Sequence, residues 1–336
     1  MPGLLNSFLA LTAFRNPLLR TVVPSVALAY GIQAAFAVPS IAAQSERFYD
    51  LSGSLTYLSC TAFSFSLPYL RARAAGAASG GILEYLKAPA PGQSLWFWRQ
   101  AVLSAAVGIW ATRLGTYLFK RISADGHDSR FDEIRKSPPK FFGAWMAQAT
   151  WVSLCLMPVI AVNALPRSAF SLYRFKNVGD TFSVLPAAPF LTDVLGMGLF
   201  VFGLAFEIAA DRQKSQWVQE KKDKKHSEEF LTRGLWGKSR HPNYFGEMTL
   251  WTGIAVAAGG LLVRYPAQVG LGLSGAFGGR ATVVGMATVS PAFVSFLLLK
   301  VSGIPLSENK YDKRYGDRKD YQQWKETTPM LFPKFW

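Results

Sequence analysis

Long stretches of this sequence carry no charged residue. Five such windows cover residues 21–45, 51–70, 141–166, 248–263 and 281–299. A helix needs about 20 mainly apolar residues to cross the hydrocarbon core of a bilayer. Charged residues make up only 17% of the chain, against about 25% in an average soluble protein, so little polar surface is left for a soluble domain. The sequence therefore predicts a polytopic membrane protein of the all-α class.

Seven spans can be drawn, two of which carry ionisable residues. Arg113 lies in the third span, and Asp193 and Glu207 lie in the fifth. The seven predicted spans are residues 19–38, 52–70, 97–119, 141–163, 190–210, 243–263 and 281–300. Connectors rich in glycine and proline, 71–93 and 167–189, separate some of them. We expect a transmembrane helical bundle with a cytosol-facing cap made from residues 211–242 and the tail after residue 300.

Lysine and arginine are unevenly divided between the two sets of loops. Loops 39–51, 120–140 and 211–242 share a side with the tail 300–336, and together they hold 24 basic residues against 11 on the other side. Cytoplasmic loops carry the basic excess, so the C-terminus is predicted to be cytosolic. The formal charge of +15 then fits contact with anionic lipid or an anionic cofactor, and the apolar spans argue against a nucleic acid partner.

The N-terminal segment leaves three interpretations open. Arg15 and Arg20 precede the first apolar window, and the first acidic residue is Glu46. An uncleaved first span is the main expectation. A signal peptide cleaved after Ala35-Phe36-Ala37 and a mitochondrial presequence are the alternatives. Two locations are considered: the endoplasmic reticulum membrane is the default, and the acid-poor start keeps a mitochondrial membrane open as the alternative.

The segment Gly234–Glu247 joins the polar loop to the sixth span, with the sequence GLWGKSRHPNYFGE. Pro242 predicts the start of a helix, because the first turn does not need its missing N–H. A helix that begins there places Asn243 and Glu247 on one face, four residues apart. The segment can be interpreted as part of a binding site or as a polar helix cap above a basic rim.

Charged side chains flank this segment in the sequence and in the preceding span. Lys238 and Arg240 stand just before a predicted helix N-terminus, where free N–H groups favour anions. Glu207 and Asp211 are four residues apart at the end of the fifth span, with Lys214 on the same side. Ionisable groups at membrane depth usually face a cavity or a partner. These carboxylates could accept hydrogen bonds from ribose hydroxyls or close the helix as ion pairs.

The tail after the last span has an amphipathic pattern. Glu308, Tyr311 and Tyr315 are at helical spacing and form one face. That face could lie on the membrane surface or stack against a flat ring. No metal site is expected, because the three histidines lie far apart in sequence. Cys60 and Cys155 fall inside apolar windows and are expected to be buried small hydrophobes.

Together these segments resemble the C-terminal domain of the steroid 5α-reductase superfamily, closest to its branch of uncharacterised bacterial and fungal membrane proteins. The residues that carry the resemblance are Glu207–Lys214, Gly234–Glu247 with its Arg-His-Pro-Asn-Tyr-Phe-Gly-Glu core, Ser302–Pro305 and Glu308–Tyr315; Phe131–Arg135 and Gln148 also look like that branch. The resemblance starts near residue 120. It implies N-terminal helices on the substrate side, residues 1–120, followed by a reductase-like domain, residues 121–336.

The resemblance implies a membrane reductase that binds NADPH from the cytosolic side and saturates a carbon–carbon double bond of a steroid, sterol or other lipid taken from the bilayer. Its cofactor contacts would be Glu207, Asp211, Lys214, Lys238, Arg240, His241, Asn243, Tyr244 and Glu247, with Glu308, Lys310 and Tyr315 closing over the dinucleotide. Tyr244 is the expected proton donor because it lies inside the matched motif. Tyr57 and Tyr117 are the alternatives.

One departure and two competing functions accompany this resemblance. Steroid 5α-reductases carry a Gln-Glu pair in an early transmembrane helix, whereas the second span here holds no carboxylate, which argues against a 3-oxo-4-ene steroid. The isoprenylcysteine carboxyl methyltransferases have a similar Arg-His-Pro-x-Tyr segment and bind S-adenosylmethionine. Asn243 and Glu247 match the reductases instead, and only Glu308 stands where the methyltransferase tail has paired glutamates. A non-catalytic scaffold or lipid-binding subunit with the same fold is the third candidate.

Overall fold

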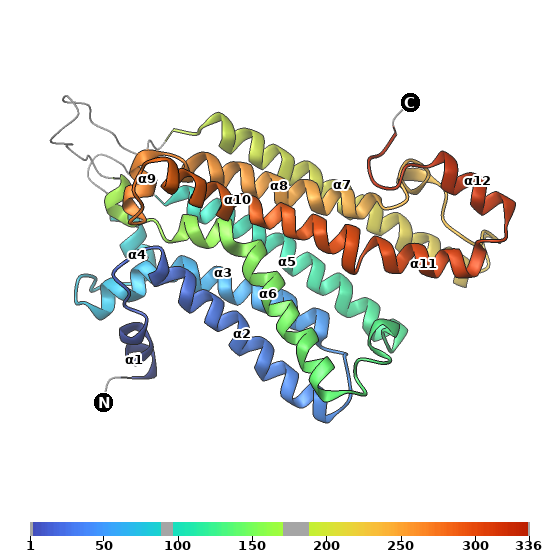
Figure 1. Cartoon of the computed structure of the whole chain (residues 1–336), viewed down its shortest axis with the longest axis horizontal. Coiled ribbons are helices and arrows are strands. Elements are labelled where there is room, and N and C mark those ends of the chain that lie inside the picture. The colour runs from blue at the N-terminus through green and yellow to red at the C-terminus, as the bar shows by residue number, and fades with distance from the viewer. Residues whose placement is uncertain (1–2, 89–96, 171–187, 335–336) are drawn as a thin grey trace. The chain divides into compact units, whose positions relative to one another are not determined.

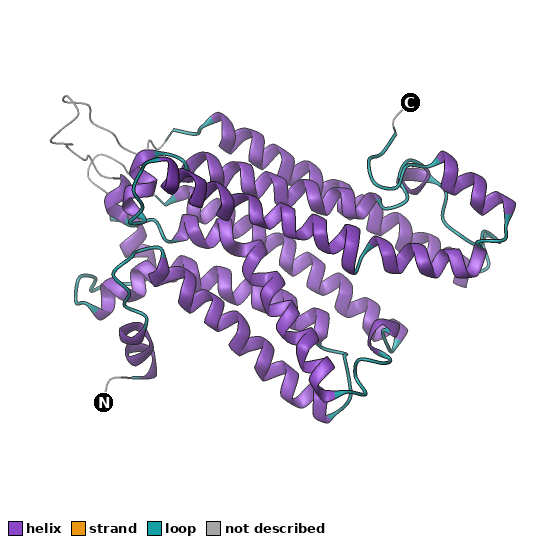
Figure 2. Cartoon of the chain, in the orientation of Figure 1, coloured by secondary structure: helices purple, strands orange, loops and turns teal. Residues whose placement is uncertain are grey.

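The computed structural model describes residues 3–88, 97–170 and 188–334. Within these ranges the chain consists of helices, turns and loops, and no strand is present (Figure 2). The predicted all-α class is confirmed. Parts of the two predicted connectors, residues 89–93 and 171–187, lie outside the described residues.

Twelve α-helices are described, most of them long. They are α1 (Leu4–Leu11), α2 (Leu19–Ala42), α3 (Tyr49–Ala74), α4 (Ile82–Lys87), α5 (Trp98–Asp125), α6 (Pro138–Asn163), α7 (Leu191–Lys222), α8 (Pro242–Leu262), α9 (Tyr265–Gly270), α10 (Phe277–Phe296), α11 (Ile304–Tyr315) and α12 (Lys319–Thr327). A π-helical turn, Leu297–Val301, follows α10. Each of the seven predicted spans coincides with a long helix, namely α2, α3, α5, α6, α7, α8 or α10.

Six helical stretches are long and apolar enough to cross a membrane. They are Leu19–Ala42, Trp98–Ala124, Pro138–Asn163, Leu191–Lys222, Pro242–Leu262 and Phe277–Tyr315. The multi-pass architecture is confirmed, but the predicted number of seven is corrected to six by this criterion. Helix α3, the predicted second span, is 26 residues long and is not among the six. Seven serine and threonine side chains between Ser52 and Ser66 lower its hydropathy.

Contacts divide the chain into two compact units. Unit 1 holds Met1–Asp193 and Ala257–Ser290, and unit 2 holds Val194–Val256 and Pro291–Trp336. Helices α7, α8 and α10 contribute residues to both units. The sequence predicts a division of the chain near residue 120 by expected role, with substrate binding before it and cofactor binding after it. That division stays a prediction.

The core of unit 1 is built from four long helices. Helix α2 packs along α6, and α3 packs against α2, α5 and α6 (Figure 1). A buried polar network links three of them. Gln148 Nε2 on α6 lies 3.2 Å from Gln33 Oε1 on α2 and 3.1 Å from Ser52 Oγ on α3, and Gln33 Nε2 donates to Thr56 Oγ1 at 2.7 Å. Two of the hydroxyl groups that lower the hydropathy of α3, those of Ser52 and Thr56, are therefore used inside the bundle, where hydrogen-bonded networks are strong.

Polar contacts between segments far apart in sequence are made at both ends of unit 1. At one end Glu46 accepts a hydrogen bond from Asp128 N at 2.9 Å and pairs with Arg135 at 3.1 Å. At the other end Arg71, near the end of α3, donates to the carbonyl oxygens of Leu9 and Thr12 at 2.9 and 3.0 Å. Helix α3 thus runs the full length of the bundle. In both cases loops predicted to share a side of the membrane are in contact.

Unit 2 is organised around a close approach of α7 and α8. A Cβ atom on Gly203 would lie 2.5 Å from Leu250 N, and one on Gly253 would lie 2.4 Å from Gly196 O. Both distances are below the separation of non-bonded atoms, so only glycine fits. Small residues that let two backbones meet are a common device between membrane helices.

Candidate functional site

The start of the predicted motif is fixed on the side of α7. Gly234 has φ +62°, a left-handed conformation that glycine adopts at little cost. The next amide, Leu235 N, donates to Gln213 Oε1 at 2.8 Å, and Trp236 Nε1 donates to Ala210 O at 3.0 Å. These contacts attach the start of the motif to α7 and so fix the direction in which residues 238–241 leave that helix.

The C-terminal segment holds the same stretch from the other side. Hydrogen bonds join residues 238–240 to residues 329–334. The shortest run from Arg240 N to Pro329 O at 2.9 Å, from Ser239 Oγ to Leu331 O at 2.8 Å, and from Lys334 N to Lys238 O at 3.0 Å. Ser239 is completely buried. Residues 238–241, which we call the strap, are therefore held between α7 and the C-terminal segment.

A polar cluster forms where this strap meets α11 and α12. Glu308 Oε2 accepts from Arg240 Nη1 at 2.6 Å, and Glu308 Oε1 lies 2.8 Å from His241 Nε2. Lys325 Nζ lies 3.2 Å from Glu308 Oε2 and donates to both oxygens of Asp312, at 2.6 and 2.7 Å. We call these five residues the Glu308 cluster. It brings together three segments that are far apart in sequence.

The protonation states of the cluster follow from burial and from its hydrogen bonds. Burial lowers the pKa of His241, and the hydrogen bond that its ring donates to Glu308 only partly opposes this. The imidazole is therefore neutral at pH 7, and because a carboxylate only accepts, Nε2 carries the proton. Burial also disfavours the charged form of Lys325, but hydrogen bonds to Asp312 and Glu308 outweigh it and raise the pKa of Lys325.

Helix α8 begins at Pro242, as the sequence predicts. In its first turn the ring of Tyr244 lies parallel to that of His241, with centroids 5.6 Å apart and 9° between the planes. Gly246 follows Tyr244 by two residues, and a Cβ atom on it would lie 2.7 Å from Glu207 N. The first turns of α8 are thus packed directly against α7 at Glu207.

Several predicted site residues meet in this region. Arg240, His241 and Glu308 are in direct contact, and Tyr244 stacks on His241. Lys214 Nζ lies 4.9 Å from the ring centre of Trp236, the residue that anchors the strap. The carboxylate-bearing residues Glu207 and Asp211 on α7 are 3% and 6% exposed. The segments that carried the resemblance are therefore assembled within unit 2.

Two predicted cofactor residues on α11 have other surroundings. The phenol of Tyr315 donates to Glu229 O at 2.9 Å, and its ring packs with Phe230 and Tyr321. Lys310 is exposed. Their predicted role in closing over a cofactor stays a prediction.

Among the residues that the structure describes, two buried polar atoms of residues 240–243 have no hydrogen-bond partner. They are the Nε of Arg240 and the Oδ1 of Asn243, the first a donor and the second an acceptor. Buried polar atoms are nearly always paired. The site therefore fits a ligand, or ordered water, that offers both an acceptor and a donor.

Sequence reasoning missed Asp312 and Lys325. Asp312 was within reach, because it follows Glu308 by four residues on the same helix and so shares its face. Lys325 had no comparable signal, since it joins the cluster only through the packing of α12 on α11. Among the described residues, no group of three or more His, Cys, Asp or Glu is arranged to hold a metal ion.

Fold and site together define an all-helical, multi-pass membrane protein with a polar cluster at the end of its C-terminal helices. Residues 75–266 and 276–328 match the family described as "Protein of unknown function (DUF1295)". These ranges cover most of the chain, so the protein belongs to that family. Searches of curated proteins and of solved structures found no significant match.

Proposed function

We propose that the protein is a membrane-embedded, NADPH-dependent reductase that saturates a carbon–carbon double bond of a lipid. The observation that carries the proposal is the Glu308 cluster. It joins the Arg-His-Pro-Asn-Tyr-Phe-Gly-Glu segment to the tail across 68 residues of sequence through the contact of Arg240 with Glu308, the two segments on which the resemblance to steroid 5α-reductases depends.

The residues present suit a dinucleotide phosphate. Lys214, Lys238 and Arg240 supply positive charge for phosphate groups, and Arg is well suited to such contacts. The unpartnered Nε of Arg240 can donate to a phosphate oxygen, and the unpartnered Oδ1 of Asn243 can accept from an amide or hydroxyl group. Glu207, Asp211 and Glu247 would accept hydrogen bonds from ribose hydroxyls.

Each side chain of the cluster has a distinct task in this proposal. Glu308 keeps Arg240 oriented, and it accepts a hydrogen bond from the Nε2–H of the neutral His241. NADPH, when bound, supplies the hydride. Tyr244, stacked on His241, would hold the proton at its phenol oxygen for delivery to the other end of the double bond. Orientation and control of protonation are what the protein contributes to cofactor chemistry of this kind.

The substrate class is a membrane lipid with a polarised alkene, because the six apolar helices expose the protein to the bilayer. Sterol, steroid and enoyl-chain substrates all remain within the proposal. Residues 51–70 of α3 hold no carboxylate, which disfavours a steroid enone. The proposed orientation has the C-terminus in the cytosol, where NADPH is supplied, and the proposed location is the endoplasmic reticulum membrane.

The test is titration of the detergent-purified protein with NADPH, NADH and S-adenosylmethionine. Energy transfer from the ten tryptophans to the nicotinamide reports the first two ligands, and calorimetry reports the third. We expect saturable NADPH binding that is lost in the double variant Asn243→Ala, Glu247→Ala and in Arg240→Met. Lys313→Met, an exposed lysine on α11, is the matched control and should bind like wild type.

Other outcomes of this titration would replace the proposal. Binding of S-adenosylmethionine without NADPH would favour a methyltransferase. Binding of neither ligand by a folded protein would favour a non-catalytic scaffold or lipid-binding subunit.

A further inference from the structure

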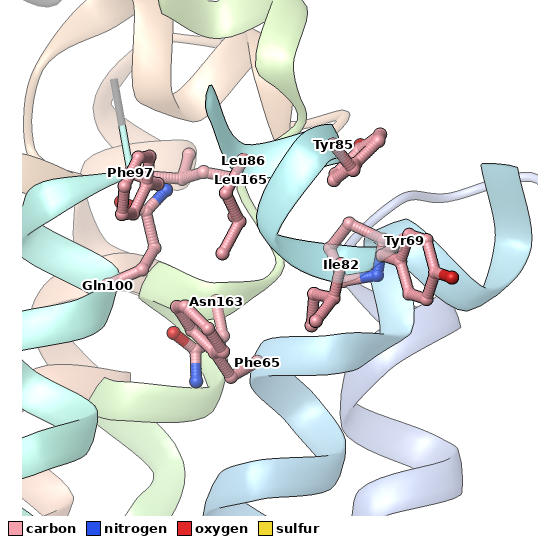
Figure 3. Close-up of a pocket in the computed structure, with 10 residues that line it drawn as sticks. Phe65, Tyr69, Ile82, Tyr85, Leu86, Phe97, Gln100, Asn163 and Leu165 are labelled. Carbon is pink, nitrogen blue, oxygen red and sulfur yellow. The ribbon is translucent and has the colours of Figure 1, made fainter. Parts of the chain in front are cut away.

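A small pocket lies in unit 1 among α3, α4, α5 and the end of α6. Phe65, Tyr69, Phe97, Gln100 and Asn163 are among the residues that line it (Figure 3). Its free space accommodates about one water molecule, to which the unpartnered amide of Gln100 can hydrogen-bond. A pocket of this size holds no lipid or cofactor, whereas the surface of unit 2 carries a larger apolar feature.

Helix α7 exposes a stripe of apolar side chains. The exposed residues recur at spacings of three and four and so lie along one side of the helix. Within unit 2, between residues 194 and 210, they are Val194, Leu195, Gly198, Leu199, Val201, Phe202 and Ala205. Helix α7 is one of the helices that can cross a membrane, so this stripe faces the acyl chains of lipids.

A row of aromatic rings continues from the stripe to the C-terminal segment. The ring centroids of Phe202 and Phe206 are 5.7 Å apart, and that of Phe206 is 5.2 Å from the centroid of Phe245. The ring of Phe332 follows, with its centroid 5.8 Å from that of Phe245. We call these four residues, which all belong to unit 2, the phenylalanine row. Phe245 is only three residues beyond Pro242, about 4.5 Å along α8, so Phe332 lies at the edge of the apolar spans.

Phe332 is 73% exposed, although its segment is held in place. Leu331 and Pro333 on either side of it are buried, and Leu331 O and Lys334 N are both hydrogen-bonded to the strap. The backbone therefore fixes the ring in an outward position. Residues 327–334 contain no acidic residue, so anionic lipid headgroups would not repel the segment.

We propose that residues 329–334 lie on the bilayer surface and that the ring of Phe332 inserts among the acyl chains of lipids beside α7. The partner is lipid hydrocarbon, because the ring extends a row that begins on the lipid-facing side of α7. Since the strap is hydrogen-bonded to this segment, the membrane also supports the strap that carries Arg240 and His241. The proposal goes beyond the proposed function and does not depend on it, because no cofactor takes part.

Photolabelling of the unaltered chain is the direct test. The protein is placed in nanodiscs that contain a phosphatidylcholine with a diazirine on its acyl chain, and after irradiation it is digested with trypsin. We expect the label on the peptide of residues 326–334, at residues 330–332. The peptide of residues 320–325 from α12, whose exposed side chains are polar, is the internal control and should stay unlabelled. Label on α7 with none on residues 326–334 would overturn the proposal.

Single substitutions test the role of the ring itself. Phe332→Glu removes the apolar group and should lower labelling of residues 326–334 about tenfold, whereas Phe332→Leu should retain most of it. Gln323→Glu adds the same charge at an exposed position of α12 and should be labelled like wild type. Thermal unfolding midpoints show that each variant is folded. Equal labelling of Phe332→Glu and wild type would refute the insertion of Phe332.

A nitroxide spin label reports the position of residue 332 independently. The label is attached to the variants Phe332→Cys, Phe202→Cys and Gln323→Cys in nanodiscs, and the native Cys60 and Cys155 are buried. Oxygen concentrates in hydrocarbon, and a nickel chelate stays in water. We expect the label at position 332 to collide mainly with oxygen, as the label at position 202 does, and the label at position 323 to collide mainly with nickel. A label at position 332 that behaves like the one at position 323 would place the ring in water and overturn the proposal.

Discussion

Glu308 is the acceptor that several donors share at the cluster. Its side chain is 18% exposed, that of Arg240 is 12% and that of His241 is 6%, so the contacts are largely shielded from water. Hydrogen bonds to charged groups contribute about 1.5–3 kcal/mol each, and a donor left without a partner costs more than the bond gained. The cluster thus matters for stability whether or not it binds a cofactor.

We expect Glu308→Ala to lower the free energy of unfolding by about 2 kcal/mol, because Arg240 and His241 both lose their acceptor. The measurement is the unfolding midpoint in detergent, followed by tryptophan fluorescence. Glu326→Ala, an exposed glutamate on α12, is the control and should change the midpoint little. If both variants are equally stable, the contacts contribute nothing in solution.

The pH dependence of stability should report His241. Its pKa in the folded protein is lowered by burial, so below the ordinary value of about 6.5 the unfolded chain binds more protons than the folded one. Stability is then fully present above that value and falls as the pH drops below it. We expect the unfolding midpoint to decrease between pH 7.5 and 5.5, and the decrease to be smaller in His241→Gln. An identical decrease in both proteins would assign the effect to other groups.

The residues of the site were only partly predictable from sequence. Arg240 and Glu308 could be named because each lies in a segment of distinctive sequence, and the helix start at Pro242 followed from the chemistry of proline. Lys325 could not be named, since its place depends on how α12 returns along α11.

At the scale of elements, the contact of α7 with α8 sets the position of the strap. Gly203→Ala should destabilise the protein by about 1–3 kcal/mol, because the added Cβ atom would lie 2.5 Å from Leu250 N and 2.6 Å from Gly246 O, both backbone atoms. Thermal unfolding of the purified variant measures the effect, and NADPH titration shows whether the site is displaced as well.

Gly198→Ala in the same helix is the matched control. A Cβ atom there has nothing within 4 Å, and alanine favours a helix over glycine by up to about 1 kcal/mol. We therefore expect this variant to be as stable as wild type or slightly more stable. A loss of stability equal to that of Gly203→Ala would show that close packing of α7 on α8 is not the cause.

Apolar patterning located each long helix but not its ends, since α7 continues to Lys222 and α5 to Asp125 beyond the predicted spans. Helix α3 shows where patterning is insufficient. Its position as a span was predicted from a charge-free window. Its composition falls short of the other spans because Ser52 and Thr56 serve the network around Gln33 and Gln148. A hydropathy scale counts every serine and threonine hydroxyl as polar, whether or not it has a partner. In α3 the hydroxyl groups of Ser52 and Thr56 are hydrogen-bonded inside the bundle.

For the whole molecule, the division of basic residues predicts one orientation in the membrane. Ser129 and Ser227, both exposed, lie in loops predicted to be cytosolic, and exposed Ser79 lies in a loop predicted to be on the other side. Cysteine placed singly at each position should react with a membrane-impermeant maleimide from the predicted side only. The native cysteines Cys60 and Cys155 are buried, so background labelling should be low. Labelling of all three from one side would contradict the topology.

The strap also has a consequence for biogenesis. Ser239 bonds to Leu331, 92 residues later in the chain, and translation at about 5–20 residues per second takes roughly 5–20 s to cover that distance. During this interval the Arg-His-Pro-Asn segment has neither its C-terminal partner segment nor, at first, Glu308. A nascent chain that stops before residue 329 would carry every apolar helix and still lack a closed strap. The hydrogen bonds between the strap and residues 329–334 thus form only after translation of the C-terminal segment, later than synthesis of the last apolar helix.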